Sequence, residues 1–162
     1  MYINHIQLKA ARCLLNLGVR EIGLFIQTSR TTISKLENNI IKLSEMRLGD
    51  RRNKILCEFF KKEGITFPNA YTLNFSPKIF SVLDDNFKNT TLTNLQLKAS
   101  RIILNKTQLE LAKEFNINVG FIKRYEKKQT NDLLTISTLK NKLEERGIHF
   151  PNKFSITFEN IS

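Results

Sequence analysis

The sequence contains few of the residues from which metal sites, disulfide frameworks and catalytic centres are built. His5 and His149 are the only histidines among 162 residues, and neither belongs to a cluster of metal ligands. Cys13 and Cys57 are too few for a disulfide framework, and they fit a reducing cytosol. The sequence also lacks a Gly-rich phosphate loop and a nucleophile motif. We therefore expect no metal, no cofactor, no catalytic residue and no enzymatic activity.

Long apolar runs and a secretory signal are missing as well. No stretch approaches the ~20 apolar residues that span a membrane, and Met1–His5 has neither the basic start nor the apolar run of a signal. Positive charge, in contrast, is in excess, with 26 lysines and arginines against 15 acidic residues and a net charge of +11. This composition predicts a cytoplasmic protein that has no membrane contact and binds a polyanion.

An internal repeat organises the chain. Residues 7–37 align without a gap with residues 96–126, and ten aligned positions are identical. A shorter match, between 64–69 and 147–152, follows at a smaller offset, so the first copy contains six extra residues around 39–52. Two matched blocks in the same order predict a duplication. The identical positions include Gln7/Gln96, Arg12/Arg101, Leu15/Leu104, Glu21/Glu110 and Glu37/Glu126.

The duplication predicts two domains, residues 1–75 and 91–162, that are joined by a linker at 76–90. The first domain has 12 basic and 6 acidic residues and the second has 12 and 7, while the linker is neutral. Each domain therefore carries its own positive charge, whereas a solvating tail would concentrate the charge at one end.

Capping residues and apolar spacing predict three short helices at the start of each domain. Gln27 and Asn116 stand where the chain must turn between the second and third helices, because a left-handed residue is needed there. Gly23 and Ala112 are the small residues expected where the third helix crosses the second. The predicted caps and capping boxes are Asn4, Gln7 and Ser29 in the first domain and Thr93, Gln96, Thr107, Glu110 and Asn118 in the second.

Each domain continues into further helix that ends at Gly64 or Gly147, two predicted left-handed caps. An apolar pattern of period 2 with a central Pro-Asn follows in both copies and predicts a β-hairpin. We therefore expect a mainly α protein with two tandem domains of about five helices, each followed by a small hairpin.

The first copy carries a family resemblance in the stretch SRTTISKLEN at 29–38. It resembles the third helix of the repressor/Cro/XRE family of lambda-repressor-like helix-turn-helix domains. The second copy is similar to the family through TQLELAKEF, at 107–115, and departs from it in NVGFIKRYE, at 118–126. The resemblance implies two helix-turn-helix domains, sequence-specific binding of double-stranded DNA, and a nucleoid-associated, repressor-like regulator that represses or activates transcription.

The resemblance also implies a set of DNA contacts, because the family docks its third helix in the major groove. The implied base-reading residues are Arg30, Thr31, Ser34 and Lys35 in the first domain, with Val119, Gly120, Lys123 and Arg124 at the equivalent surface of the second. The implied phosphate contacts are Asn38, Gln108, Arg12, Lys42, Lys127 and Lys128. Since Val119 and Gly120 offer almost no directional hydrogen bonds, we expect the first domain to read sequence and the second to add affinity.

Two other functions fit the same residues. One is an antitoxin-type regulator that also binds a partner protein, and the other is an interaction module that has lost DNA recognition. An isolated hairpin is marginally stable in water. We therefore also expect the two hairpins to pair with each other as a pseudo-dimer, or with those of a second chain as a homodimer.

Overall fold

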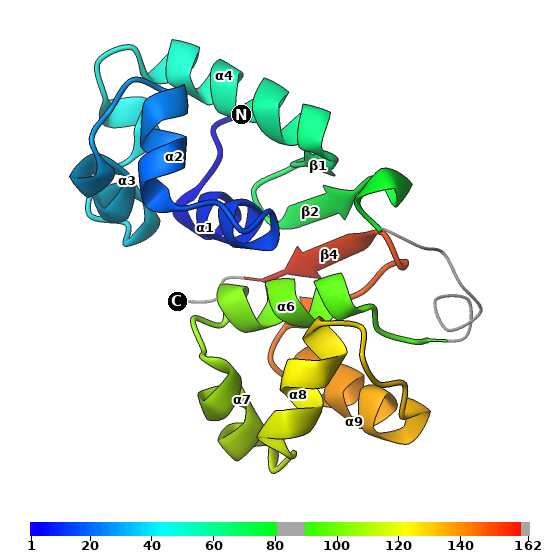
Figure 1. Ribbon diagram of the computed structural model, residues 1–162. Helices are drawn as coiled ribbons and strands as arrows, with labels where there is room; N and C mark the ends of the chain where they lie inside the picture. Colours follow the sequence, from blue (N-terminus) through cyan, green and yellow to red (C-terminus); the bar gives the residue numbers. More distant parts are fainter. Residues whose placement is uncertain (81–89, 160–162) are drawn as a thin grey trace. The chain divides into compact units, whose positions relative to one another are not determined.

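The structure, a computed structural model, describes residues 1–80 and 90–159 (Figure 1). The chain divides into two compact units, Met1–Ile79 and Phe80–Ser162. It is mainly helical with short antiparallel strands, which confirms the predicted fold class at that level. Most of the predicted linker, at 81–89, lies outside the described residues. No helix in the described ranges is both long and apolar enough to cross a membrane.

Unit 1 contains four α-helices followed by a two-stranded hairpin. Its elements are α1 (His5–Leu14), α2 (Val19–Phe25), α3 (Arg30–Glu37), the 3-10 turn η1 (Leu43–Glu45), α4 (Gly49–Glu63), β1 (Ile65–Thr66), β2 (Thr72–Phe75) and the 3-10 turn η2 (Pro77–Ile79).

Unit 2 contains the same order of α-helices and strands. Its elements, within residues 90–159, are α6 (Asn94–Ile103), α7 (Gln108–Phe115), α8 (Val119–Glu126), α9 (Leu133–Glu144), β3 (Ile148–His149) and β4 (Ser155–Phe158).

The expectation of about five helices in each domain was wrong for the described residues, which form four α-helices in each unit. The extra residues of unit 1 lie between α3 and α4, where they form only the single turn η1. In unit 2, six residues connect α8 to α9, and this length leaves no room for another helix.

The predicted helix starts are confirmed by their hydrogen bonds. At α1, Asn4 Oδ1 accepts a bond of 2.8 Å from the Gln7 N–H, and the Asn4 N–H donates back to Gln7 Oε1 at 3.3 Å. Thr93 and Gln96 form the same reciprocal capping box at α6, with distances of 3.2 and 2.8 Å. Since the first N–H groups of a helix have no partner within the helix, these side chains fix where each unit begins its first helix.

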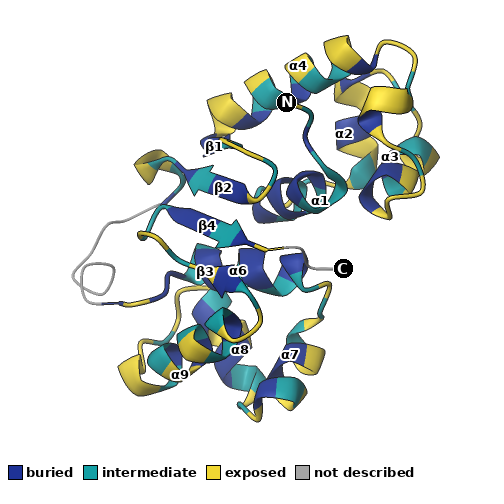
Figure 2. Cartoon of the chain, turned by 180° about the vertical axis from the view of Figure 1, so that it is seen from behind, coloured by how far each residue is buried: buried dark blue, intermediate teal, exposed yellow. Residues whose placement is uncertain are grey.

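A buried glutamine ties the first helix of each unit to its hairpin. Gln7 Nε2 donates to the Asn69 and Thr72 carbonyls at 2.7 and 3.1 Å, and no part of Gln7 is exposed. Gln96 Nε2 donates to the equivalent carbonyls of unit 2 at 2.7 and 3.0 Å. Each unit has its own buried residues, coloured dark blue in Figure 2. The fully buried apolar side chains include Ile22, Ile33, Leu56 and Phe60 in unit 1 and Leu97, Leu111, Ile122 and Ile136 in unit 2.

The hairpins follow the predicted apolar pattern. Ile65 stands opposite Phe75 in unit 1, and Ile148 stands opposite Phe158 in unit 2. Each hairpin begins after a glycine in the left-handed region, with φ of 98° at Gly64 and 77° at Gly147. Gly64 is the left-handed C-cap of α4, as predicted, whereas α9 ends at Glu144 with Glu145 as its C-cap and Gly147 directly precedes β3.

Candidate nucleic-acid interface

In unit 1, α2 and α3 are joined by residues 26–29 in a tight turn. Gln27 has φ of 52°, and the Thr28 N–H donates to the Gly23 carbonyl at 2.8 Å. A Cβ atom on Gly23 would lie 2.8 Å from the Thr28 carbonyl oxygen, closer than side chains tolerate. The predicted turn residue and the predicted small residue are therefore both confirmed, and glycine is what lets the turn approach α2.

The helix α3 presents one polar face to solvent. Ser29 caps it by accepting a bond of 3.1 Å from the Thr32 N–H. Ile33, Leu36 and Glu37 are buried on the inner side. Four of the predicted DNA contacts, Arg30, Thr31, Lys35 and Asn38, are exposed on the outer side and Ser34 is half-buried beside them. The structure thus brings all four predicted base readers of unit 1 onto one accessible surface.

The helix α8 presents a different face. Asn118 caps it by accepting a bond of 2.7 Å from the Gly120 N–H, and Asn116 makes the preceding left-handed turn with φ of 51°. Inner positions Phe121, Ile122 and Tyr125 are buried. On the outer side Lys123, Arg124, Lys127 and Lys128 are exposed, whereas Val119 and Gly120 are half-buried. This surface offers cations with few directional hydrogen-bonding groups.

Arg12, a predicted phosphate contact, is engaged in an ion pair within unit 1. Arg12 Nε and Nη2 bind the two carboxylate oxygens of Glu37 at 2.5 and 2.8 Å, and Nη1 donates to the Leu17 carbonyl at 2.7 Å. The side chains of Arg12 and Glu37 are 14% and 6% exposed. The hydrogen bond to Glu37 raises the pKa of Arg12. The guanidinium therefore holds α1 against α3, and three of its five N–H groups are engaged within unit 1.

Gln108 is partly committed to a similar ion pair in unit 2. Arg101 binds both oxygens of Glu126 at 2.7 and 3.0 Å, and Gln108 Nε2 donates a third bond to Glu126 at 2.8 Å. Of the two amide N–H groups of Gln108, this bond leaves one for a phosphate. Unit 1 has Val19 at the equivalent position and so has no counterpart to this third bond.

These two ion pairs were not predicted from the sequence, although the sequence contains a signal for them. Arg12 and Glu37 are identical to their counterparts Arg101 and Glu126, while most residues of the exposed faces differ between the copies. At these two positions, identity between the repeats reflects an internal contact that both units share. Lys42, the remaining predicted phosphate contact, is exposed in the extra segment between α3 and α4.

Comparisons with known proteins add no family assignment. No protein-family model matches the chain, and neither the curated proteins nor the solved structures contain a match. Within the described ranges, no group of three or more histidine, cysteine or acidic residues is placed to hold a metal ion. The function must therefore be inferred from the surfaces of α3 and α8.

Proposed function

We propose that this protein binds double-stranded DNA as a transcriptional regulator, through helix-turn-helix motifs formed by α2–α3 and α7–α8. The observation that carries the proposal is the polar face of α3, where Arg30, Thr31 and Lys35 are exposed above a buried apolar side. Two short helices joined by a three- or four-residue turn are typical of this motif, whose second helix enters the major groove.

The chemistry of this face suits base recognition. An arginine makes two parallel hydrogen bonds to guanine O6 and N7, and Thr or Ser hydroxyls contact several base edges. Arg30 and Thr31 stand in the first turn of α3, the end that the motif directs toward the bases. We therefore assign sequence reading to unit 1.

Unit 2 supplies affinity in this proposal. Lys123, Arg124 and Lys127 are suited to phosphate oxygens, which position a protein on the duplex without reporting sequence. The net charge of +11 favours the same polyanion. The two units then divide the work of one DNA-binding protein.

The test begins with selection of bound fragments from random duplex DNA, followed by titration of variants against the selected site. Arg30→Ala should cost about 1–3 kcal/mol and relax the preference at one base pair. Lys123→Ala, the matched variant on α8, should lower the affinity for all DNA sequences alike. It should also reduce the slope of log affinity against log salt concentration by about one. The assignment is reversed if Lys123→Ala changes the preferred sequence and Arg30→Ala leaves it intact.

Salt dependence tests DNA binding itself. If six or more phosphates are contacted, affinity for the selected duplex should fall by orders of magnitude between roughly 50 and 200 mM salt, because lysines and arginines displace counterions. Absence of duplex binding at low salt, or an affinity that is flat over this range, contradicts the proposal.

One observation favours a second function, the binding of a partner protein as in an antitoxin-type regulator. Leu24 and Phe25 on α2 are 71% and 47% exposed, and Phe25 packs against Phe59 with ring centroids 4.3 Å apart. Unit 2 has Lys113 and Glu114 at the positions of Leu24 and Phe25. Exposed apolar side chains of this kind are typical of protein interfaces. Purification from native cells distinguishes the functions, since an antitoxin should copurify with a stoichiometric partner.

A further inference from the structure

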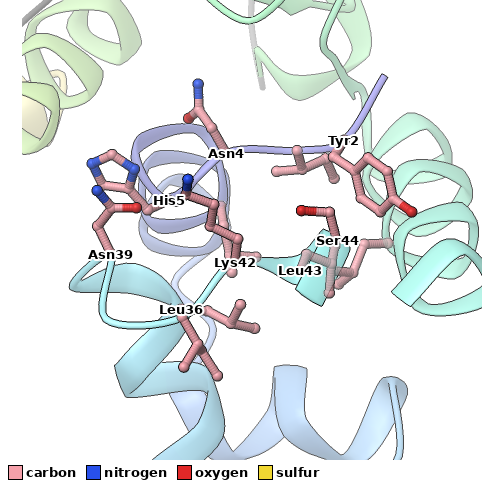
Figure 3. Close-up of a pocket in the computed structure, with 12 residues that line it drawn as sticks. Tyr2, Asn4, His5, Leu36, Asn39, Lys42, Leu43 and Ser44 are labelled. Atoms are coloured by element: carbon pink, nitrogen blue, oxygen red, sulfur yellow. The ribbon is translucent and has the colours of Figure 1, made fainter. Parts of the chain in front are cut away.

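Unit 1 contains a pocket of about 290 Å³ beside α3 (Figure 3). The pocket lies between the start of α1, the end of α3 and the extra segment that precedes α4. Native interiors are close-packed and rarely leave a space larger than a water molecule. The volume is near the lower end of small-molecule sites, which measure ~300–1,000 Å³.

The floor of the pocket is apolar. Five of its lining side chains are no more than 5% exposed, and they come from the N-terminal segment, three helices and the extra segment. These residues are Ile3, Leu8, Leu36, Leu43 and Leu56. Such a floor suits the hydrocarbon part of a ligand, whose burial contributes ~25 cal/mol per Å² of apolar surface.

The rim of the pocket is polar and basic. His5, Asn39 and Lys42 lie on one side of the pocket, and Tyr2 and Ser44 lie on the other (Figure 3). None of the lining residues is acidic. Because Lys42 and Asn39 are exposed and offer N–H donors, the rim favours a negatively charged group over a positive one.

The pocket depends on residues that unit 2 lacks. Asn39, Lys42, Leu43 and Ser44 all belong to the connection between α3 and α4, residues 38–48, which is longer than the six-residue connection between α8 and α9. This segment is held close to the start of α4, since a Cβ atom on Gly49 would overlap the Leu43 carbonyl oxygen. The wall of the pocket is therefore fixed by backbone packing, and the insertion that distinguishes the two units builds it.

We propose that this pocket binds a small amphipathic carboxylate, with its hydrocarbon part on the apolar floor and its carboxylate at Lys42 and Asn39. The inference goes beyond DNA binding, because the site lies in unit 1 alone and its test contains no DNA. The shared chemistry, one carboxylate on an apolar body of limited size, describes both aliphatic and aromatic acids.

The test titrates the full chain with octanoate and with 3-phenylpropionate, using calorimetry together with amide NMR shifts. Octanol serves as the uncharged control. Binding of either acid should saturate and move the signals of the pocket residues in unit 1, and the acid that binds more tightly identifies the ligand class. Octanol should bind more weakly than octanoate by roughly tenfold or more, because it lacks the charge-assisted bond to Lys42.

Variants locate the carboxylate. Lys42→Gln should weaken octanoate by roughly tenfold or more, whereas Lys54→Gln, which removes an exposed lysine of α4 outside the pocket lining, should leave the affinity unchanged. Circular dichroism of both variants checks that each is folded. Failure of both acids to bind at millimolar concentration, equal binding by octanol, or equal affinity of folded Lys42→Gln and Lys54→Gln would overturn the proposal.

Discussion

In each unit a half-buried arginine connects the first helix to the third through a glutamate. The two ion pairs have the same atoms in contact, and their side chains have the same exposed fractions of 14% and 6%. A buried carboxylate is costly when its partner is removed, because desolvation is then uncompensated. The glutamate at the end of α3 or α8 also stands at the negative end of the helix dipole, so the arginine offsets two unfavourable effects.

The two pairs should respond differently to loss of the arginine. Arg12→Ala leaves Glu37 without a side-chain donor and should lower the free energy of unfolding by about 3–5 kcal/mol. Arg101→Ala should cost less, because Gln108 still donates to Glu126. Urea unfolding followed by NMR signals of the affected unit measures both effects. Equal losses would show that the Gln108 bond has no energetic role, and Gln108→Val in the Arg101→Ala background should then change nothing.

His5 gives unit 1 a dependence on pH. Burial, and then the charge of Lys9, lowers the pKa of His5 from its ordinary value of 6.5. The unfolded chain therefore binds more protons than the folded chain between the lowered pKa and 6.5, so stability should fall as the pH decreases below about 6.5. Thermal unfolding at several pH values between 5 and 7.5 measures this loss. His5→Gln should reduce the dependence, and an unchanged pH profile in that variant would contradict this origin.

At the level of elements, the α2–α3 turn depends on the absence of a side chain at Gly23. Alanine favours helices over glycine by ~1 kcal/mol, yet the Cβ of Gly23→Ala would press on the Thr28 carbonyl oxygen. We expect the clash to exceed the gain, with a net loss of about 1–2 kcal/mol in the free energy of unfolding. Because the turn positions α3, affinity for DNA should fall together with stability.

A second variant tests the start of the same helix. Gly18 is the N-cap of α2 and lacks a capping side chain. Gly18→Ser supplies one and should raise the free energy of unfolding by a few tenths of a kcal/mol. Chemical denaturation of the two variants compares them directly. A stabilising Gly23→Ala would mean that the turn relaxes and that the close approach is not required.

The sequence could predict the elements because their signals are local. Asn4, Thr93 and Ser29 carry the capping signal in their own side chains, and Gly64 marks the helix end through its backbone freedom. The predicted face of α3 followed from the spacing of Ile33 and its neighbours. Local signals of this kind fix where helices begin and which side they bury.

The remaining features depend on contacts between distant residues, which no local pattern reveals. The family resemblance implies a phosphate contact for Arg12, whereas its ion pair with Glu37 arises only from the packing of α1 on α3. The pocket likewise joins residues from the N-terminal segment, α3 and α4. The repeat offsets predict where the six extra residues lie. They do not predict that this segment lines a pocket, because the pocket forms only when the segment packs against other elements.

At the scale of the whole molecule, the two units share an internal framework and differ in their surfaces. The capping boxes, the buried glutamines and the ion pairs recur at equivalent positions. The outer faces of α3 and α8, the residues at Leu24 and the segment that lines the pocket differ between the units. A duplication that keeps its framework and varies its surfaces gives one chain two units with different exposed chemistry.

The expected pairing of the hairpins, within one chain or between two, is open to a backbone measurement. The Ser76 N–H donates to the Gly64 carbonyl at 2.7 Å, and alternation along an antiparallel ladder then directs the N–H groups of Leu73 and Phe75 to the other edge of β2. Pairing along that edge should slow hydrogen exchange at the amides of Leu73 and Phe75. Their rates should then match the rate of the Asn74 amide, which is paired with Thr66 within the hairpin. Exchange as fast as in an unstructured peptide would show the edge to be unpaired. Light scattering over a range of concentrations separates the pseudo-dimer from the homodimer.

The shared framework also has a consequence for how the chain reaches its native state. The helix of Gln7 and Arg12 carries the same donors as the helix of Gln96 and Arg101, and each unit offers acceptors of the same kind at equivalent places. Either first helix can therefore dock in the wrong unit, and misassembly of this kind is a known failure of repeat proteins. During synthesis unit 1 emerges first and can form its core before the first helix of unit 2 has been made. Dilution from denaturant removes that order, so refolding should pass through trapped, exchanged species that synthesis on the ribosome avoids.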